Sequence, residues 1–270
     1  MNGTLWLVAT PIGNLGDLQP RAIEMLATAE LVCCEDTRRT GLLLHNSGVK
    51  AKRMAVCNEH TEHDLTDRVL GVLGSGGNVA VVSDAGTPGV SDPGERLVKA
   101  AIEAGHDVSS VPGPSAAVMA VTISGLDTSR FVFEGFLPRK GRERAARLAE
   151  LASEQRTSVL YEAPHRALRT LTDLGEVCGP DRHIVVAREL TKLHETIVRG
   201  PLGSIDIGDP RGEYVFVLAG VPVDDTPTTD EDVQRLLDEA IATGMTKRDA
   251  AAAVAKQTGR SRRDVYQLTI

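Results

Sequence analysis

Aromatic residues are scarce in this chain of 270 residues, and only 3% of it is Phe, Trp or Tyr. The core must therefore be built mainly from Leu, Val, Ile and Ala, a composition that suits α/β packing. The same scarcity argues against an RNA-recognition sheet, because such a sheet stacks bases on exposed aromatic rings.

Cysteine is also rare, and long apolar runs are missing. The four cysteines, Cys33, Cys34, Cys57 and Cys178, have no spacing typical of a disulfide framework. Neighbouring cysteines on a strand point to opposite faces, so we interpret them as small core residues in a reducing compartment. Apolar runs such as 79–82 are too short to cross a bilayer. No signal peptide is predicted either, so we expect a cytoplasmic protein without a membrane partner.

Two common nucleotide-binding fingerprints are absent. No G-x-G-x-x-G follows the first apolar run, and G-x-x-x-x-G-K-[ST] occurs nowhere. The sequence thus disfavours NAD-dependent dehydrogenases and P-loop ATPases.

What is present is a regular alternation of apolar runs and amphipathic segments. In the first half, strands are expected at 4–9, 31–35, 51–56, 78–83 and 107–111, each followed by a helical pattern. Five strand–helix units in about 120 residues predict a parallel sheet with helices on both faces.

The second half begins at the VPGP stretch, 111–114, which can continue neither a helix nor a central strand. Strands without intervening helices accumulate towards its end, which favours a mixed sheet. A polar linker and two or three short helices follow, with Thr246 and Ser261 as N-caps and Gly244 and Gly259 as stops. We therefore predict α/β domains at 1–112 and 113–222, and a module of helix-turn-helix type at 229–270.

Four loops rich in glycine and proline follow the predicted strands of the first domain, at 9–17, 34–40, 83–94 and 111–117. One such loop could be a simple tight turn. Four on the same edge of a parallel sheet indicate a ligand cleft, because ligands bind at the carboxyl ends of such strands. S-adenosylmethionine carries no phosphate, so it is compatible with loops that lack a phosphate cradle.

The net charge of −7 argues at first against nucleic acid, but cations gather in two segments. Residues 138–148 hold five cationic side chains and one anionic, and residues 246–263 hold six and one. Taken alone, such segments are typical of solvated helix faces. On an acidic body they also fit a protein that contacts phosphates locally.

Seven motifs in order carry a specific resemblance: ATPIGNLGD, CEDTRRT, SDAGTPGVSDPG, VPGPSA, FEGFLPRKGRER, YEAPHR and RELTKLHET. The chain resembles the tetrapyrrole-methylase superfamily and, within it, the bacterial enzymes that methylate the 2′-hydroxyl of a cytidine in small-subunit (16S) ribosomal RNA. This resemblance covers essentially the whole chain. It implies S-adenosylmethionine as cofactor, a cleft between two α/β domains that holds it, a homodimer, and ribosomal RNA or the assembled 30S subunit as partner.

The resemblance also implies which residues contact the cofactor, many of them through main-chain atoms. These are Pro11, Ile12, Asp84, Gly86, Thr87, Ser115, Ala116, Ala163 and Ala187.

Methyl transfer to a ribose also needs an acceptor for the hydroxyl proton and cations for the flanking phosphates. The candidates for the base are Asp36, Glu59, His60, Glu162 and His165. Those for phosphate contacts are Arg38, Arg39, Arg139, Lys140, Arg166 and Lys192. Each carboxylate could instead form an ion pair with these arginines, and His165 could bond at a helix start.

One segment departs from the family pattern, because Asn58 in CNEHTEHD stands where a histidine is usual. This departure puts in doubt an essential role for that imidazole. The spacing of Cys57, His60 and His63 imitates a metal site, but the segment offers no fourth ligand, so no metal is expected.

Other functions remain open at this point. A porphyrinoid methylase is disfavoured by the basic FLPRKGRER segment and the helical tail. A non-catalytic RNA-binding or ribosome-assembly factor would keep the cleft but show no turnover. A sugar-nucleotide or phosphate-binding enzyme is weakened by the missing phosphate loops.

Overall fold

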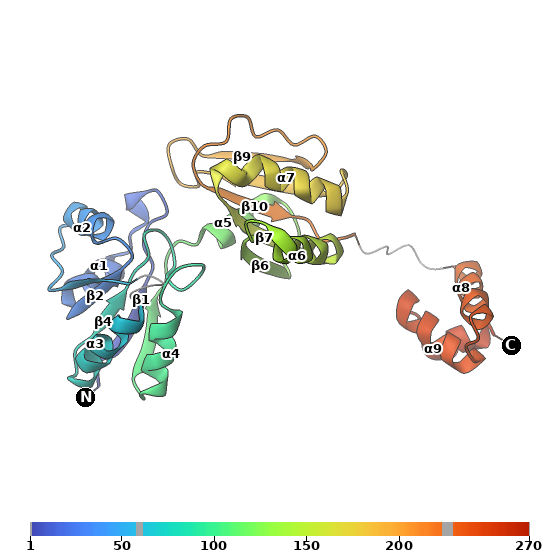
Figure 1. Cartoon of the computed structure of the whole chain (residues 1–270), viewed down its shortest axis with the longest axis horizontal. Coiled ribbons are helices and arrows are strands. Elements are labelled where there is room, and N and C mark those ends of the chain that lie inside the picture. Colours follow the sequence, from blue (N-terminus) through green and yellow to red (C-terminus); the bar gives the residue numbers. More distant parts are fainter. Residues whose placement is uncertain (1, 58–61, 223–228, 270) are drawn as a thin grey trace. The chain divides into compact units, whose positions relative to one another are not determined.

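The computed structural model describes residues 2–57, 62–222 and 229–269. Its contacts divide the chain into two compact units, residues 1–221 and 222–270. The first unit holds two β-sheets with their helices, and the second holds only helices (Figure 1).

The first sheet is entirely parallel, as predicted, with the strand order β3-β2-β4-β1-β5. Its strands are β1 (Thr4–Val8), β2 (Leu31–Cys34), β3 (Met54–Val56), β4 (Val79–Val81) and β5 (Asp107–Val111). The connecting elements are η1 (Leu15–Asp17), α1 (Pro20–Thr28), α2 (Thr37–Asn46), α3 (Glu62–Gly74) and α4 (Glu95–Glu103).

Helices cover both faces of this sheet, which confirms the doubly covered arrangement. On one face α3 and α4 pack against the strands, and on the other α1 and α2 do so. Cys33 belongs to the first of these cores and Cys34 to the second. The two neighbouring thiols therefore point to opposite faces of β2, as the alternation of a strand requires.

The second sheet is mixed, in the order β6-β7-β10-β8-β9, with only the β6–β7 pair parallel. Its strands are β6 (Phe131–Phe136), β7 (Thr157–Glu162), β8 (His183–Arg188), β9 (Thr196–Pro201) and β10 (Tyr214–Leu218). The helices around it are α5 (Ala116–Ser124), α6 (Gly141–Ser153) and α7 (Pro164–Cys178). Together the two sheets confirm the predicted class of two α/β domains.

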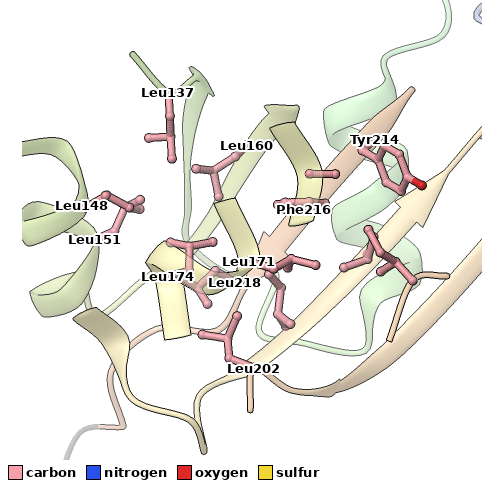
Figure 2. Packing of buried hydrophobic residues seen from close by; sticks show 14 residues of the cluster. Leu137, Leu148, Leu151, Leu160, Leu171, Leu174, Leu202, Tyr214, Phe216 and Leu218 are labelled. Carbon is pink, nitrogen blue, oxygen red and sulfur yellow. The ribbon is translucent and has the colours of Figure 1, made fainter. Parts of the chain in front are cut away.

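The period-two pattern of β10 explains how the second sheet buries both faces. Tyr214 and Phe216 pack on one face against the leucines of α6 and α7 (Figure 2). Val215 and Val217 pack on the other face, against α5. Ile12, from the loop after β1, joins this last core, so the first loop of the first domain is anchored on the second domain.

The basic segment 138–148 is only partly a surface feature. Arg144 is 4% exposed, and its guanidinium donates to the Asp173 carboxylate at 2.6 and 2.9 Å, to the Thr170 hydroxyl at 2.9 Å and to the Pro138 carbonyl at 3.0 Å. Arg139, Lys140, Arg142 and Arg147 are exposed. The segment therefore offers four cations to solvent rather than the five that the sequence suggested.

The C-terminal unit consists of α8 (Asp230–Ala242), α9 (Lys247–Thr258) and α10 (Arg262–Gln267) around a small apolar core. Thr246 and Ser261 accept hydrogen bonds from the backbone of the first helical turn, which confirms both predicted N-caps. Gly259 ends α9 with a positive φ, and Gly244 follows the end of α8 with one. None of the described helices is both long enough and apolar enough to span a bilayer.

Candidate functional site

Hydrogen bonds join the loops at the carboxyl ends of β1, β4 and β5. Thr10 and Gly86 exchange two backbone hydrogen bonds, of 2.9 and 3.1 Å. The Thr87 hydroxyl donates to the Pro114 carbonyl at 3.1 Å. The Thr10 hydroxyl donates to the Ser83 carbonyl at 3.2 Å. These bonds hold three of the four predicted loops in one fixed arrangement.

Beside these loops lies a cavity of about 340 Å³, here called the acidic cavity. Its first-domain wall is formed by Ile12, Glu35, Asp84, Ala85, Gly86, Thr87, Val90, Ser91 and Asp92, and the segment that joins the two domains adds Ser115 and Ala116. Its second-domain wall is formed by Phe136, Tyr161, Glu162, Ala163, Pro164, Glu213, Tyr214 and Val215. The cavity therefore lies between the two α/β domains, and its volume is in the range of cofactor sites, about 300–1,000 Å³.

Seven of the nine predicted cofactor contacts are brought together in this lining: Ile12, Asp84, Gly86, Thr87, Ser115, Ala116 and Ala163. Pro11 instead lines a cavity next to it. Ala187 is 1% exposed in the core of the second sheet and lines neither cavity. The contacts of these residues with the cofactor stay predictions.

The charge of the lining is one-sided. Five carboxylic acids contribute to it: Glu35, Asp84, Asp92, Glu162 and Glu213. None of the described lining residues is a lysine, an arginine or a histidine. Arg39, Arg166 and Lys192 contact Asp84, Glu162 and Glu213 from outside the lining and offset part of this charge. The remaining negative charge favours a ligand with positive charge over a chain of phosphates.

Three of these carboxyl groups, on Glu35, Asp84 and Asp92, form an acidic cluster. The Glu35 carboxylate accepts the backbone N–H of Asp84 at 2.9 Å, and Arg39 lies 3.3 Å from the Asp84 carboxylate. Burial, with the charges of Glu35 and Asp84 added, raises the pKa of Asp92 to about 6. Burial and the charge of Asp84 also raise the pKa of Glu35. Asp92 is thus the carboxyl group of this cluster that is poised to take up a proton near neutral pH.

Two glycines allow the backbone to approach closely here. Gly86 has a φ of +85°, and a Cβ at this position would lie 3.2 Å from the Ile12 side chain. A Cβ on Gly13 would lie 2.4 Å from a carbon of the Lys192 side chain. The loop after β1 therefore fits against the second domain only because residue 13 has no side chain.

The predicted catalytic residues are not gathered in one place. Asp36 caps α2, and its hydrogen bonds with Arg38 hold the pKa of its carboxyl far below the usual range. Glu162 lines the acidic cavity, but its buried carboxylate accepts from the Thr170 hydroxyl at 2.6 Å and contacts Arg166 at 3.1 Å. His165 is exposed and lines neither cavity. Glu59 and His60 lie outside the described residues.

The predicted phosphate contacts divide into two groups. Arg38, Arg39, Arg139 and Lys140 are exposed to solvent. Arg166 has a side-chain exposure of only 16% and donates to the Leu137 carbonyl at 2.6 Å. The ammonium of Lys192 lies 2.8 Å from the Glu189 carboxylate and 2.9 Å from that of Glu213. Arg166 and Lys192 would have to leave these partners in order to hold a phosphate.

Eleven of the lining residues were not singled out from the sequence, and four of these bear on the chemistry of the cavity: Glu35, Asp92, Phe136 and Tyr161. Glu35 and Asp92 lie in the quoted motifs CEDTRRT and SDAGTPGVSDPG, but their convergence depends on the strand order. The Phe136 and Tyr161 rings meet edge to face, with centroids 5.6 Å apart.

A second cavity of about 370 Å³, here called the adjoining cavity, shares Ile12, Asp84, Ala85 and Glu213 with the first. Its remaining lining comes from the loop after β1, from α2, from the loop after β4 and from Lys192: Thr10, Pro11, Gly13, Leu15, Arg39, Thr40, Leu42, Leu43, Asn46, Ser83 and Lys192. Among the described residues, no group of three or more His, Cys, Asp or Glu side chains could hold a metal ion.

Two protein-family models match this chain. The family model of Tetrapyrrole (Corrin/Porphyrin) Methylases matches residues 4–206. The model of the RsmI C-terminal HTH domain matches residues 227–270.

Several relatives that share one name are similar to this chain over nearly their whole length. A Ribosomal RNA small subunit methyltransferase I from Synechocystis sp. is 46% identical, with 99% of this chain and 98% of the relative covered. One from Pseudomonas aeruginosa is 42% identical, with 98% and 96% covered.

Solved structures agree on the fold. The methyltransferase CobJ superposes with a TM-score of 0.61 at 21% identity, covering 81% of this chain and 95% of that one. A uroporphyrin-III C-methyl transferase from Thermus thermophilus complexed with S-adenyl homocysteine gives a TM-score of 0.56 at 18% identity, with 80% and 97% covered. The chain therefore belongs to the tetrapyrrole methylases and, among them, to the family of ribosomal RNA small subunit methyltransferase I.

Proposed function

We propose that this chain transfers a methyl group from S-adenosylmethionine to the 2′-hydroxyl of a cytidine in small-subunit (16S) ribosomal RNA. The observation that carries the proposal is the acidic cavity, together with near full-length similarity to ribosomal RNA small subunit methyltransferase I proteins. Five carboxylic acids and no described basic side chain line a space of cofactor size.

The cavity fits this cofactor in both charge and shape. S-adenosylmethionine supplies an electrophilic methyl carbon on a positively charged sulfur. The acidic lining complements that charge, and the rings of Phe136 and Tyr161 add faces that attract a cation. A nucleoside triphosphate would instead meet repulsion from the same carboxylates.

The predicted contacts give each loop a part in holding the cofactor. Ile12 from the first loop, Gly86 and Thr87 from the third, and Ser115 and Ala116 from the fourth would form one wall. Ala163, just before α7, would form part of the other wall. Pro11 and Ala187 lie outside this lining and would contribute only by shaping the neighbouring backbone.

We assign the uptake of the hydroxyl proton to the acidic cluster rather than to Glu162 or His165. Burial and the negative charges of Glu35 and Asp84 raise the pKa of Asp92, so Asp92 is the member of the cluster that we expect to take the proton. Asp84 lines both cavities, which puts its carboxylate where donor and acceptor would meet. Asp92, with a pKa of about 6, gives the cluster a basicity matched to neutral pH.

The exposed cations would hold the RNA. Arg38, Arg39, Arg139 and Lys140 can reach phosphates without losing a buried partner. We assign the binding of the cofactor and of the acceptor to the domains 1–112 and 113–222. The helical module 229–270 would add further contacts to the RNA. The protein would act as a homodimer in the cytoplasm. Sedimentation of the purified chain measures its oligomeric state, and a monomer would contradict the proposed homodimer.

The direct test uses S-adenosylmethionine with a tritiated methyl group and small ribosomal subunits that lack their native methylations. After nuclease digestion, we expect the label in a nucleoside. Cofactor binding without labelled RNA would contradict the proposed function. A precorrin-type substrate assayed in parallel by visible absorption distinguishes a porphyrinoid methylase.

A further inference from the structure

The adjoining cavity differs from the acidic cavity in its chemistry. Its lining includes two cations, Arg39 and Lys192, and the amide of Asn46, whereas the described lining of the acidic cavity holds no cation. The two cavities meet at Ile12, Asp84, Ala85 and Glu213. Ligands in the two cavities would therefore be neighbours on either side of these four residues.

Two large apolar side chains line the adjoining cavity while exposed to solvent. Leu15 is 54% exposed and Leu42 is 61% exposed. Exposed leucines beside polar groups are suited to hold the faces of a flat ring. Enzymes that modify a nucleotide hold the extruded base in this way, between apolar side chains with hydrogen bonds at its edge.

The position of Arg39 adds a contact for the sugar-phosphate backbone. Its side chain is 70% exposed and lies 3.3 Å from the Asp84 carboxylate, at the wall common to both cavities. A guanidinium carries five N–H donors, so contact with one carboxylate oxygen leaves donors for a phosphate. The amide of Asn46 can donate to and accept from the edge of a base.

We propose that the adjoining cavity is the seat of the acceptor nucleotide, with its base between Leu15 and Leu42 near Asn46 and its phosphate on Arg39. The inference rests on the proposed function and extends it, because it names where the nucleotide sits. Since Asp84 belongs to both walls, a ribose hydroxyl in this seat faces the acidic cavity, where the methyl donor would be bound.

Two variants test the seat, and neither replaces a residue that lines the acidic cavity. Arg39 does contact the carboxylate of Asp84, which lines both cavities. Asn46→Trp places a large side chain in the adjoining cavity from the last residue of α2, and Asn46 is exposed, so the fold should tolerate it. His45→Trp is its matched control, because His45 is also exposed but lines neither cavity. Arg39→Ala removes the cation, and Lys50→Ala removes an exposed cation that lines neither cavity.

The readouts are single-turnover transfer to unmethylated small subunits, the KM for those subunits, and the Kd of S-adenosylmethionine by calorimetry. For Asn46→Trp we expect roughly a hundredfold loss of transfer, since a misplaced acceptor loses its alignment. For Arg39→Ala we expect a rise in KM of about tenfold. For Asn46→Trp the Kd of S-adenosylmethionine should stay within about twofold, because this variant changes no residue that lines the acidic cavity.

Each of the following outcomes would contradict the proposal that the acceptor nucleotide binds in the adjoining cavity. Transfer by Asn46→Trp equal to that by His45→Trp would show that the acceptor lies elsewhere. An equal loss in both tryptophan variants would assign the effect to α2 as a whole. A weakened Kd of S-adenosylmethionine in Asn46→Trp would show that the adjoining cavity belongs to the cofactor. A wild-type chain that binds the cofactor but methylates no RNA would contradict the proposed function itself, and the seat with it.

Discussion

Asp92 owes its weak acidity to burial and to two carboxylates, one of which follows a different strand. Glu35 comes after β2 and Asp84 after β4, and both add negative charge to a side chain that burial already disfavours as an anion. Nothing local in the sequence marks Asp92, because its neighbours are more than fifty residues away or belong to its own loop. The sequence could indicate that the loops bind a ligand, but it could not indicate which carboxyl groups would meet.

The acidic cluster predicts how methyl transfer depends on pH. The cluster must be deprotonated to accept the hydroxyl proton, so the rate should rise with pH and level off above about 6, the pKa of Asp92. Below this point the rate should fall about tenfold per pH unit. Glu35→Gln removes a neighbouring negative charge and can still accept the Asp84 N–H, so it should move this limb to lower pH. Single-turnover rates from pH 5 to 8 measure this shift of the pH profile. A profile of Glu35→Gln that coincides with that of the wild type would contradict the role of Asp92 as the proton acceptor.

The ionised carboxylate of Asp92 should also lower the free energy of unfolding. Because the pKa of Asp92 is raised from 3.8 to about 6 on folding, the folded chain binds more protons than the unfolded chain between these values. Its stability therefore falls as the pH rises through this window, and the loss persists above it. The full shift corresponds to about 3 kcal/mol, and solvent screening of the half-exposed carboxyl reduces this to about 1 kcal/mol.

Asp92→Asn should accordingly raise the free energy of unfolding by about 1 kcal/mol at pH 7.5 and leave it nearly unchanged at pH 4. Urea unfolding at the two pH values measures this difference. Glu103→Gln, in the exposed last turn of α4, is the control and should show no such pH dependence. Equal effects of Asp92→Asn at both pH values would contradict the raised pKa.

Arg144 shows the limit of interpreting charge from sequence alone. It stands in a run of cations typical of an exposed helix face, yet its guanidinium lies in the second domain and joins Asp173, Thr170 and the Pro138 carbonyl. Arg144→Ala would leave these polar groups without their partner, so we expect a loss of about 3 kcal/mol in the free energy of unfolding.

Two further variants make this measurement specific. Arg142→Ala, two residues away and exposed, should change the free energy of unfolding by less than about 0.5 kcal/mol. Arg144→Lys keeps the charge but loses the fork of donors, so it should restore only part of the stability. Equal unfolding midpoints for Arg144→Ala and Arg142→Ala would show that the buried contacts contribute nothing.

Among the elements, the strands and helices were largely predictable. The strand at 107–111 has the predicted bounds, and those predicted at 4–9 and 31–35 end one residue earlier, because apolar periodicity acts locally. The N-caps Thr246 and Ser261 and the stop at Gly259 were predictable for the same reason.

The C-terminal helices carry a prediction about RNA. Lys247 and Arg260 are held by the Thr269 carbonyl and by Asp230, whereas Arg248, Lys256, Arg262 and Arg263 are exposed. Replacing Arg262 and Arg263 together by Ala should weaken binding of small subunits and reduce its salt dependence by about one to two units of slope. Cofactor affinity should not change.

Anisotropy titrations at several salt concentrations measure this effect. The matched control replaces Arg211 and Arg235, whose exposed side chains pair with Asp209 and Asp232. An equal loss of affinity in both double variants would reduce the effect to net charge. Deleting residues 223–270 should weaken RNA binding further while cofactor binding persists, and unchanged RNA binding would contradict the role of this unit.

At the scale of the whole molecule, the order of the strands decides the function. The order β3-β2-β4-β1-β5 places the ends of β2 and β4 side by side, which brings Glu35 to the Asp84 N–H. Ile12 reaches the core of the second sheet, and Gly13 fits against Lys192. These contacts join distant parts of the chain, so periodicity could predict a cleft but neither the two cavities nor the wall between them.

The most direct test of the whole account is nucleoside mass spectrometry of 16S RNA from unmethylated small subunits treated with the wild-type chain and S-adenosylmethionine, with chromatographic separation of methylcytidine isomers. The proposed function predicts 2′-O-methylcytidine as the new nucleoside, formed in amounts that follow the protein and the cofactor. A methyl group on the cytosine ring, on another nucleoside, or on no RNA at all would contradict it.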